Sequence, residues 1–279
     1  MMTDRDSITL LDKSNKSSAA PAPDAEVLHY EFVFLGKPIH LDIALAKSMA
    51  KLSDIVPLAR VLSSKLAIIT LEQLREDGET IGCCKYCSAC CKYLVPLSIP
   101  EAFRLNDEIK ALPEQFRQQF TQSFVDASEK ILSKENEDFD LNESSVSQLQ
   151  LSQISKWYSD LQLSCPLLFD DLCTLYEQRP LACREHIVTD SADLCHLDSV
   201  GEPRVVPMSV SILDALGELT GELLESQTKA VILPLALPWT QENIELSNRT
   251  WSSKKMVDRF MDIVKSKVQE YSNAQLVNA

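Results

Sequence analysis

Side chains alternate between apolar and polar from residue 28 to residue 43, the first regular pattern in the chain. Aromatic and aliphatic residues stand at every second position, and Gly36 separates two such runs. A period of two is typical of half-buried strands, and glycine between them favours a tight turn. The segment therefore predicts a β-hairpin. Pro38 lacks an N–H to donate, so the return strand is expected at a sheet edge.

Later segments instead repeat apolar side chains every three or four residues, the period of an amphipathic helix. The first spans about residues 54–76, with Pro57 in its first turn and Gly78 as the stop signal. Ser98 and Glu101 have the Ser-x-x-Glu spacing of a capping box, which predicts a helix start. Together, the pattern predicts further helices over residues 98–112, 113–132, 146–161, 209–226 and 253–272.

The predicted fold class is mainly α, with a small N-terminal β-hairpin and a loop-rich centre organised by cysteine and metal. Residues 164–206 contain several prolines and cysteines with little periodicity, which indicates loops rather than regular elements. The expected organisation is a disordered tail over 1–27, a single cysteine-cluster metal-binding domain over 28–272 and a tail over 273–279. Within the domain, we expect two metal segments, 83–91 and 164–196, and a mobile insert at about 133–145.

Length and composition allow a hydrophobic core without covalent cross-links, because the chain has 279 residues and 45% hydrophobic content. No N-terminal stretch is apolar enough for a signal peptide. The most apolar later segment, residues 230–239, contains two prolines and is half the ~20 residues that a membrane-spanning helix needs. We therefore expect a soluble, cytoplasmic protein whose thiols stay reduced.

The charge balance narrows the range of partners. The formal net charge is −14, and the basic residues are dispersed along the chain. Nucleic-acid binding relies on clustered lysine and arginine, so neither nucleic acid nor a membrane is an expected partner. A protein partner is left open.

All nine cysteines lie between residues 83 and 195. Cysteines used only as small buried hydrophobes would be spread more evenly, whereas Cys-x2-Cys spacing lets thiolates converge on one ion. Disulfide scaffolds are typically short and secreted, which does not describe this chain. The predicted metal ligands are Cys84, Cys87, Cys90, Cys91, Cys165, Cys173, Cys183 and Cys195.

The spacings favour more than one metal ion per chain. Adjacent residues such as Cys90 and Cys91 usually point apart, so they are suited to two different ions. The intervals between the later cysteines are too long and too unequal for a single zinc knuckle. We therefore expect the two segments to fold together around two metal centres or one polynuclear cluster. Eight thiolates would fill two tetrahedral zinc sites.

An iron–sulfur centre is the alternative to zinc at these cysteines. Cys84-x2-Cys87-x2-Cys90 reproduces the first three ligands of the bacterial ferredoxin run. That run continues with three residues before the next cysteine, whereas here Cys91 follows at once, so the chain is not a ferredoxin. Spacing leaves zinc and iron both open.

The cysteine motifs together resemble a known family. Cys84-x2-Cys87-x2-Cys90-Cys91, then Cys165-Pro-Leu-Leu, then the run from Cys173 to Arg184 are similar to the YkgJ-type cysteine-cluster family. The resemblance covers about residues 80–196 and implies a zinc- or iron-chelating domain, a type at times labelled an iron–sulfur oxidoreductase. Flagellin lysine methylases have a related cysteine arrangement. Leu167 replaces the usual Phe, and Cys83 is an additional thiol.

Several neighbours of the predicted ligands have two open interpretations. Cys83 is expected to be a free or buried thiol. His186 could complete a mixed Cys/His site or hydrogen bond to a ligand. Arg179 and Arg184 could donate to thiolates, or pair with nearby glutamates at the surface.

The leading hypothesis is a metal-binding protein whose zinc or iron is structural or carried. The alternative is a metalloenzyme, either an iron–sulfur or iron-dependent oxidoreductase or a protein-lysine methylase-like enzyme. The chain has six glycines and neither a GxGxxG nor a GxxxxGK[ST] loop. Whether it is an enzyme is therefore left undecided, and no catalytic residue is assigned.

Overall fold

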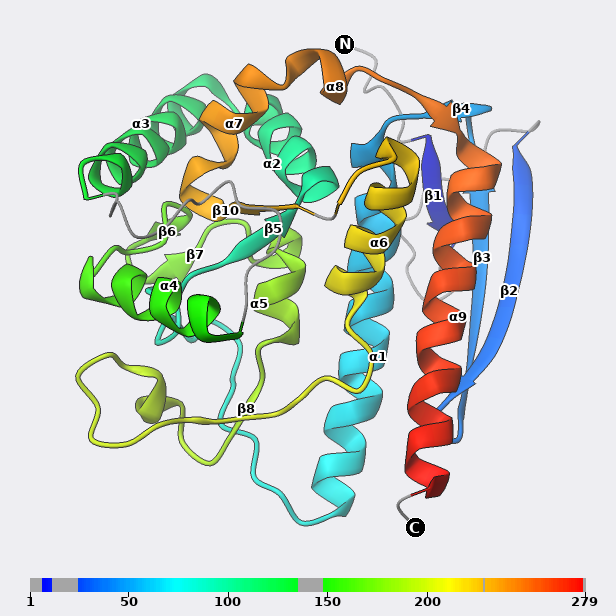
Figure 1. The fold of residues 1–279 in the computed structure, drawn as a ribbon, viewed down its shortest axis with the longest axis horizontal. Coiled ribbons are helices and arrows are strands. Elements are labelled where there is room, and N and C mark those ends of the chain that lie inside the picture. The colour runs from blue at the N-terminus through cyan, green and yellow to red at the C-terminus, as the bar shows by residue number, and fades with distance from the viewer. Residues whose placement is uncertain (1–6, 12–24, 135–147, 228, 278–279) are drawn as a thin grey trace.

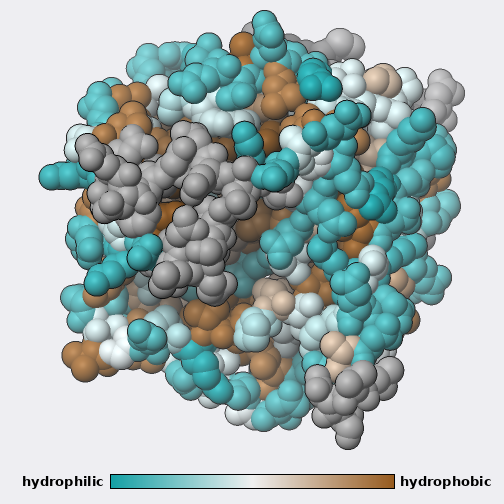
Figure 2. All heavy atoms as spheres, in the orientation of Figure 1, coloured by the Kyte–Doolittle hydropathy of each residue, from teal (hydrophilic) through white to brown (hydrophobic). Residues whose placement is uncertain are grey.

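A computed structural model describes residues 7–11, 25–134, 148–227 and 229–277. Within these ranges, a small antiparallel sheet and the helices α1, α6 and α9 form one side of the molecule, and the remaining helices and a loop-rich segment form the other (Figure 1). The predicted class, mainly α with a small N-terminal sheet, is confirmed. Hydrophilic side chains cover most of the face in Figure 2, where apolar residues form only small patches.

The predicted hairpin is present as β2 (Glu26–Phe34) and β3 (Lys37–Leu45), and Gly36 adopts a positive φ of 74° in the turn between them. A third strand, β1 (Ile8–Leu11), pairs with β3 and gives the order β1-β3-β2. The predicted tail is thus wrong over β1, because its short apolar run pairs with the hairpin.

Pro38 does not mark an edge strand, since β3 is the central strand of the sheet. Proline is tolerated there because β1 pairs with β3 only from Asp42 to Leu45. Among the described residues, no strand pairs with the side of β3 opposite β2 at Pro38, so no ladder hydrogen bond between them is lost there.

The main core lies between the sheet and three helices, α1 (Val56–Glu76), α6 (Ile212–Leu224) and α9 (Ser253–Val277). All three were expected, and a 3-10 turn, η1 (Leu52–Ile55), precedes α1. The helix α9 continues past residue 272 as far as Val277, so the predicted C-terminal tail is wrong over that stretch. The most deeply buried side chains of this core include Phe34, Leu62, Leu219 and Phe260.

A second core is built by α2 (Ile99–Ala111), α3 (Glu114–Leu132) and α7 (Ala236–Glu242), next to the strand pair β5 (Pro96–Ser98) and β10 (Ala230–Ile232). The helices α2 and α3 follow the predicted bounds. The predicted mobile insert falls mainly on residues 135–147, outside the described residues, and the next helix, α4 (Gln148–Asp160), follows it.

The segment 164–206 is loop-rich, as predicted. It contains only short elements: β6 (Leu168–Phe169), β7 (Leu172–Cys173), η2 (Tyr176–Gln178), α5 (Leu181–Glu185), β8 (Val188–Thr189), η3 (Ala192–Cys195) and β9 (Arg204–Val205). The remaining short elements are β4 (Met49–Ala50), η4 (Leu233–Leu235), α8 (Ile244–Ser247) and β11 (Trp251–Ser252). None of the helices in the described ranges has the length and apolar character required to cross a membrane.

Candidate metal centre

Backbone contacts hold the two cysteine segments against each other. The Cys165 N–H donates to the Cys91 carbonyl at 2.8 Å, and the Gly82 N–H donates to the Val188 carbonyl at 2.9 Å. A Cβ at Gly82 would lie 2.7 Å from the Asp190 carbonyl oxygen, so only glycine fits this approach. The predicted convergence of residues 83–91 with the later segment is therefore present.

Four cysteines form what we name the inner group: Cys91, Cys165, Cys173 and Cys183. Burial, with a smaller contribution from the nearby Cys173, raises the pKa of the Cys165 thiol to about 12. Burial also raises the pKa of Cys183 well above its usual value, and Cys165, Cys90 and Cys173 add to that shift. These thiols are therefore electrostatic neighbours on the side of the second core, against which Cys165 and Cys173 pack.

Three cysteines form what we name the outer group: Cys87, Cys90 and Cys195. They pack with Ala89 and Val188 in a small apolar cluster. Burial raises the pKa of the Cys195 thiol to about 11, and the proximity of Cys90 and Cys87 contributes. Residues from the first and the last part of the cysteine-rich region therefore meet at one place.

Cys90 and Cys91 connect the two groups. Adjacent residues are expected to point apart, but consecutive tight turns here bring both side chains together. A hydrogen bond between the two thiols lowers the pKa of Cys90 and raises that of Cys91. Because Cys90 also raises the pKa values of Cys165 and Cys195, both separate centres and one polynuclear cluster are compatible with this placement.

The two remaining thiols differ in their surroundings. The Cys83 sulfur accepts a hydrogen bond from the Val188 N–H at 3.3 Å, and burial raises its pKa. Cys84 is exposed. All nine cysteines are free thiols in this structure.

A cavity of about 370 Å³ lies between α1 and the outer group. Ala67 and Leu71 of α1 line one side, and cysteines of both groups line the other. His186 also lines this cavity, and its ring packs edge-on against Tyr93 with 5.7 Å between the ring centroids. The Nε2 atom of His186 is buried without a hydrogen-bond partner, and burial lowers the pKa of the imidazole.

The donor set fits zinc or iron in its chemistry, since both ions take thiolate and imidazole ligands. Among the described residues, however, no three Cys, His, Asp or Glu side chains are arranged so that they could hold one ion. The thiols are thus neighbours but not yet at ligating positions. Binding a metal would have to draw them together, and the short elements of this segment leave room for that.

Comparison with known protein families matches residues 83–199 to the CxxCxxCC family model, described as a "putative zinc- or iron-chelating domain". These residues are similar to that family, and the matched segment 83–199 is called the CxxCxxCC domain below. No curated protein and no solved structure gave a match. The domain contains all nine cysteines, including both the inner and the outer group.

Two arginines of the CxxCxxCC domain have different roles. The Arg179 guanidinium stacks over the Tyr176 ring at 4.4 Å, and its charge opposes the rise in the pKa values of Cys173 and Cys183. Arg184 donates instead to the Arg179 carbonyl at 3.0 Å, to Ser64 Oγ at 2.8 Å and to the Glu177 carbonyl. Arg179 therefore favours thiolate formation, whereas Arg184 braces the loop around the cysteines.

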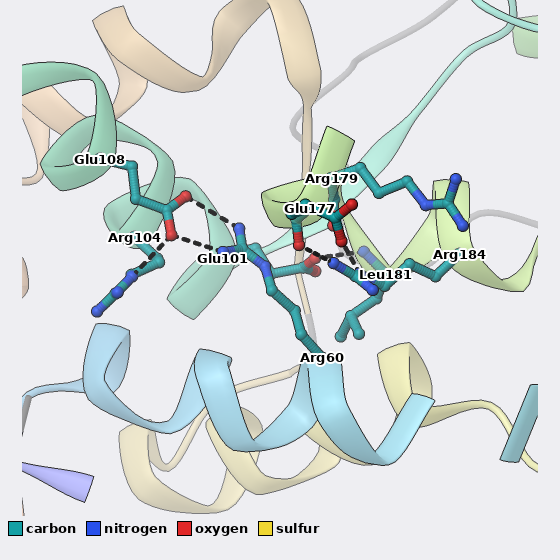
Figure 3. A network of polar contacts seen from close by, with 8 residues as sticks. All are labelled: Arg60, Glu101, Arg104, Glu108, Glu177, Arg179, Leu181 and Arg184. Atoms are coloured by element: carbon teal, nitrogen blue, oxygen red, sulfur yellow. Dashed lines mark hydrogen bonds and ion pairs between the residues drawn. The ribbon is translucent and has the colours of Figure 1, made fainter. Parts of the chain in front are cut away.

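Two glutamates, buried Glu101 and part-buried Glu185, hold α5, the short helix that carries Cys183. Glu101 accepts from the Leu181 N–H at 2.7 Å, and Figure 3 shows this contact between α2 and α5. At the other end, Glu185 accepts from the Ile212 and Leu213 N–H groups at 2.9 and 3.1 Å, which ties α5 to the start of α6. Both ends of α5 are therefore fixed to the helical scaffold.

These anchors were missed in the sequence analysis. Glu101 was expected only as part of a capping box, and it does accept from the Ser98 N–H at 3.0 Å. Its second partner lies 80 residues away, and no local pattern indicates such a contact. Glu185, five positions after Pro180, was expected only as a surface partner of Arg179 or Arg184.

Replacing Cys87 with serine should lower the metal content by about one ion per chain and destabilise the domain, because thiolates are the stronger ligands for zinc. Cys83→Ser should change neither the metal content nor the stability, since a serine hydroxyl can still accept from the Val188 N–H. Elemental analysis and thermal unfolding of both variants provide the measurement. Loss of metal in Cys83→Ser would mean that Cys83 is itself a ligand.

Proposed function

We propose that this protein binds zinc or iron in the cytoplasm through two thiolate centres, one at the inner group and one at the outer group. The observation that carries the proposal is the convergence of thiols from two distant segments, with the Cys165 N–H bonded to the Cys91 carbonyl at 2.8 Å. Burial raises the pKa values of most of these thiols, so they are costly to ionise without a cation. A bound metal would offset that cost.

The scaffold supports a structural or carrier role for the metal. The inner group supplies four thiolates, which is the number in a closed structural zinc site. Glu101 and Glu185 fix α5, so Cys183 starts from a defined position when a metal binds. The outer group supplies three thiolates of the second centre.

One observation favours a second candidate function. The cavity beside the outer group is open to a small substrate or a protein side chain, and it reaches the thiols directly. An iron–sulfur or iron-dependent oxidoreductase, or a protein-lysine methylase-like enzyme, would need such a space next to its metal centre. A redox-active iron centre would supply electrons there when bound.

Anaerobic purification followed by elemental analysis and visible absorption tests both functions. We expect at least about two metal ions per chain, with zinc favoured in aerobically purified material. A colourless anaerobic preparation without iron would exclude the redox enzyme, because zinc has no redox chemistry. A preparation with one ion or none would contradict the two-centre proposal.

A further inference from the structure

His186 has a buried nitrogen that the fold leaves without a partner. Within the described ranges, the buried side-chain nitrogen and oxygen atoms that lack a hydrogen bond are Arg60 Nε, Arg179 Nε and His186 Nε2. The two arginines are engaged through the rest of their guanidinium groups, Arg60 with Glu108 at 2.5 Å and Arg179 over the Tyr176 ring. An orphaned imidazole nitrogen is unusual, because a buried polar atom without a partner costs about 1–3 kcal/mol.

The position of His186 links it to the outer group. It follows α5 and lines the cavity that Cys87, Cys90 and Cys195 also line. Tyr93, against which its ring packs, belongs to the same apolar cluster as these three cysteines. Burial favours the neutral imidazole, which is the form that binds a metal.

The outer group is short of one donor for a closed tetrahedral site, which takes four. Cys83 and Cys84 are close in sequence, and Cys83 lies near the outer thiols, but both residues are exposed and the Cys83 sulfur already accepts from the Val188 N–H. His186 Nε2, in contrast, is buried without a partner beside the cavity that the outer thiols line. We propose that His186 Nε2 is the fourth donor of the outer centre, which makes it a Cys3His site next to an all-cysteine inner centre. This inference rests on the proposed function.

The test uses the full chain, stripped of metal and reloaded with zinc. X-ray absorption of the wild-type protein should show about one nitrogen at ~2.0–2.1 Å for every seven sulfurs at ~2.3 Å. Against a competing chelator, His186→Ala should retain about one zinc per chain where the wild type retains about two. The matched control is His196→Ala, which removes an exposed imidazole next to Cys195 and should retain both ions.

A conservative exchange guards against a folding defect. His186→Cys should restore the second zinc and give an all-sulfur absorption spectrum, since cysteine also binds zinc. An all-sulfur spectrum in the wild type, with both ions kept in His186→Ala, would refute the role of His186. Loss of one zinc in Cys84→Ser but not in His186→Ala would assign the fourth position to Cys84. Failure of the wild type to bind zinc or iron at all would refute the proposed function itself.

Discussion

Removing the metal should loosen residues 164–206 while α1 stays folded. The segment has only short elements. Leu167, Leu175 and Leu181 attach it to the two larger cores, but the apolar cluster around the outer group has three buried members, Ala89, Val188 and Cys195. Such a segment cannot recover its ordering entropy from apolar burial alone, so metal binding becomes folding energy. In small zinc domains this binding free energy is about 10–16 kcal/mol. The helix α1 should persist because Leu62 and Leu66 lie in the main core.

Hydrogen exchange and limited proteolysis, each with and without a chelator, measure this effect. We expect faster exchange and new cleavage sites in residues 164–206 after chelation, and unchanged protection of α1. Reloading the stripped protein with zinc should restore the original pattern, which controls for damage by the chelator. Equal protection of residues 164–206 in both states would show that the metal does not organise this segment.

Glu101→Ala should destabilise the fold by about 3 kcal/mol. The side chain is 1% exposed, and its removal leaves the buried N–H groups of Leu181 and Ser98 without their acceptor. Each unsatisfied donor costs about 1–3 kcal/mol. Because Leu181 is the first residue of α5, the variant should also release Cys183 from its fixed position and weaken metal retention.

Urea unfolding of the metal-loaded protein gives the change in the free energy of unfolding. The matched control is Glu114→Ala, another glutamate in the first turn of a helix, but exposed. Its effect should stay within about 0.5 kcal/mol, as is usual for surface substitutions. Glu101→Gln keeps one acceptor oxygen, so its loss in the free energy of unfolding should lie between those of Glu101→Ala and Glu114→Ala. Similar effects for Glu101→Ala and Glu114→Ala would mean that the contact with α5 contributes little.

The sequence was most informative where a local pattern sets the structure. The hairpin at Gly36, the helix α1 and the capping box at Glu101 all depend on residues within a few positions of one another. The strand β1 was not predicted, because its four residues pair only after β2 and β3 have formed a hairpin. The helix α7 was not predicted, because Pro234 and Pro238 break the periodic pattern there, although proline is compatible with a first helical turn.

In the candidate site, the type of ligand could be predicted from the sequence, but its spatial arrangement could not. The Cys-x2-Cys spacing pointed to metal, and the CxxCxxCC family model agrees with that class of ligand. The division into an inner and an outer group could not be predicted, because it depends on contacts such as the one between Cys91 and Cys165. The burial of His186 Nε2 depends likewise on Tyr93 and the cavity beside α1, which are distant in sequence.

The pairing of β4 with β11 determines when the main core can close during synthesis of the chain. Trp251 pairs with Ala50, and the Tyr30 hydroxyl donates to Asp258 of α9 at 2.5 Å, so the main core closes only after α9 has left the ribosome. At about 5–20 residues per second, the thiols of residues 83–91 emerge several seconds before their later partners. Each newly synthesised chain therefore passes through a period in which clustered thiols are exposed. Neither the inner nor the outer group can be complete before its later cysteines, Cys165 to Cys195, have been translated.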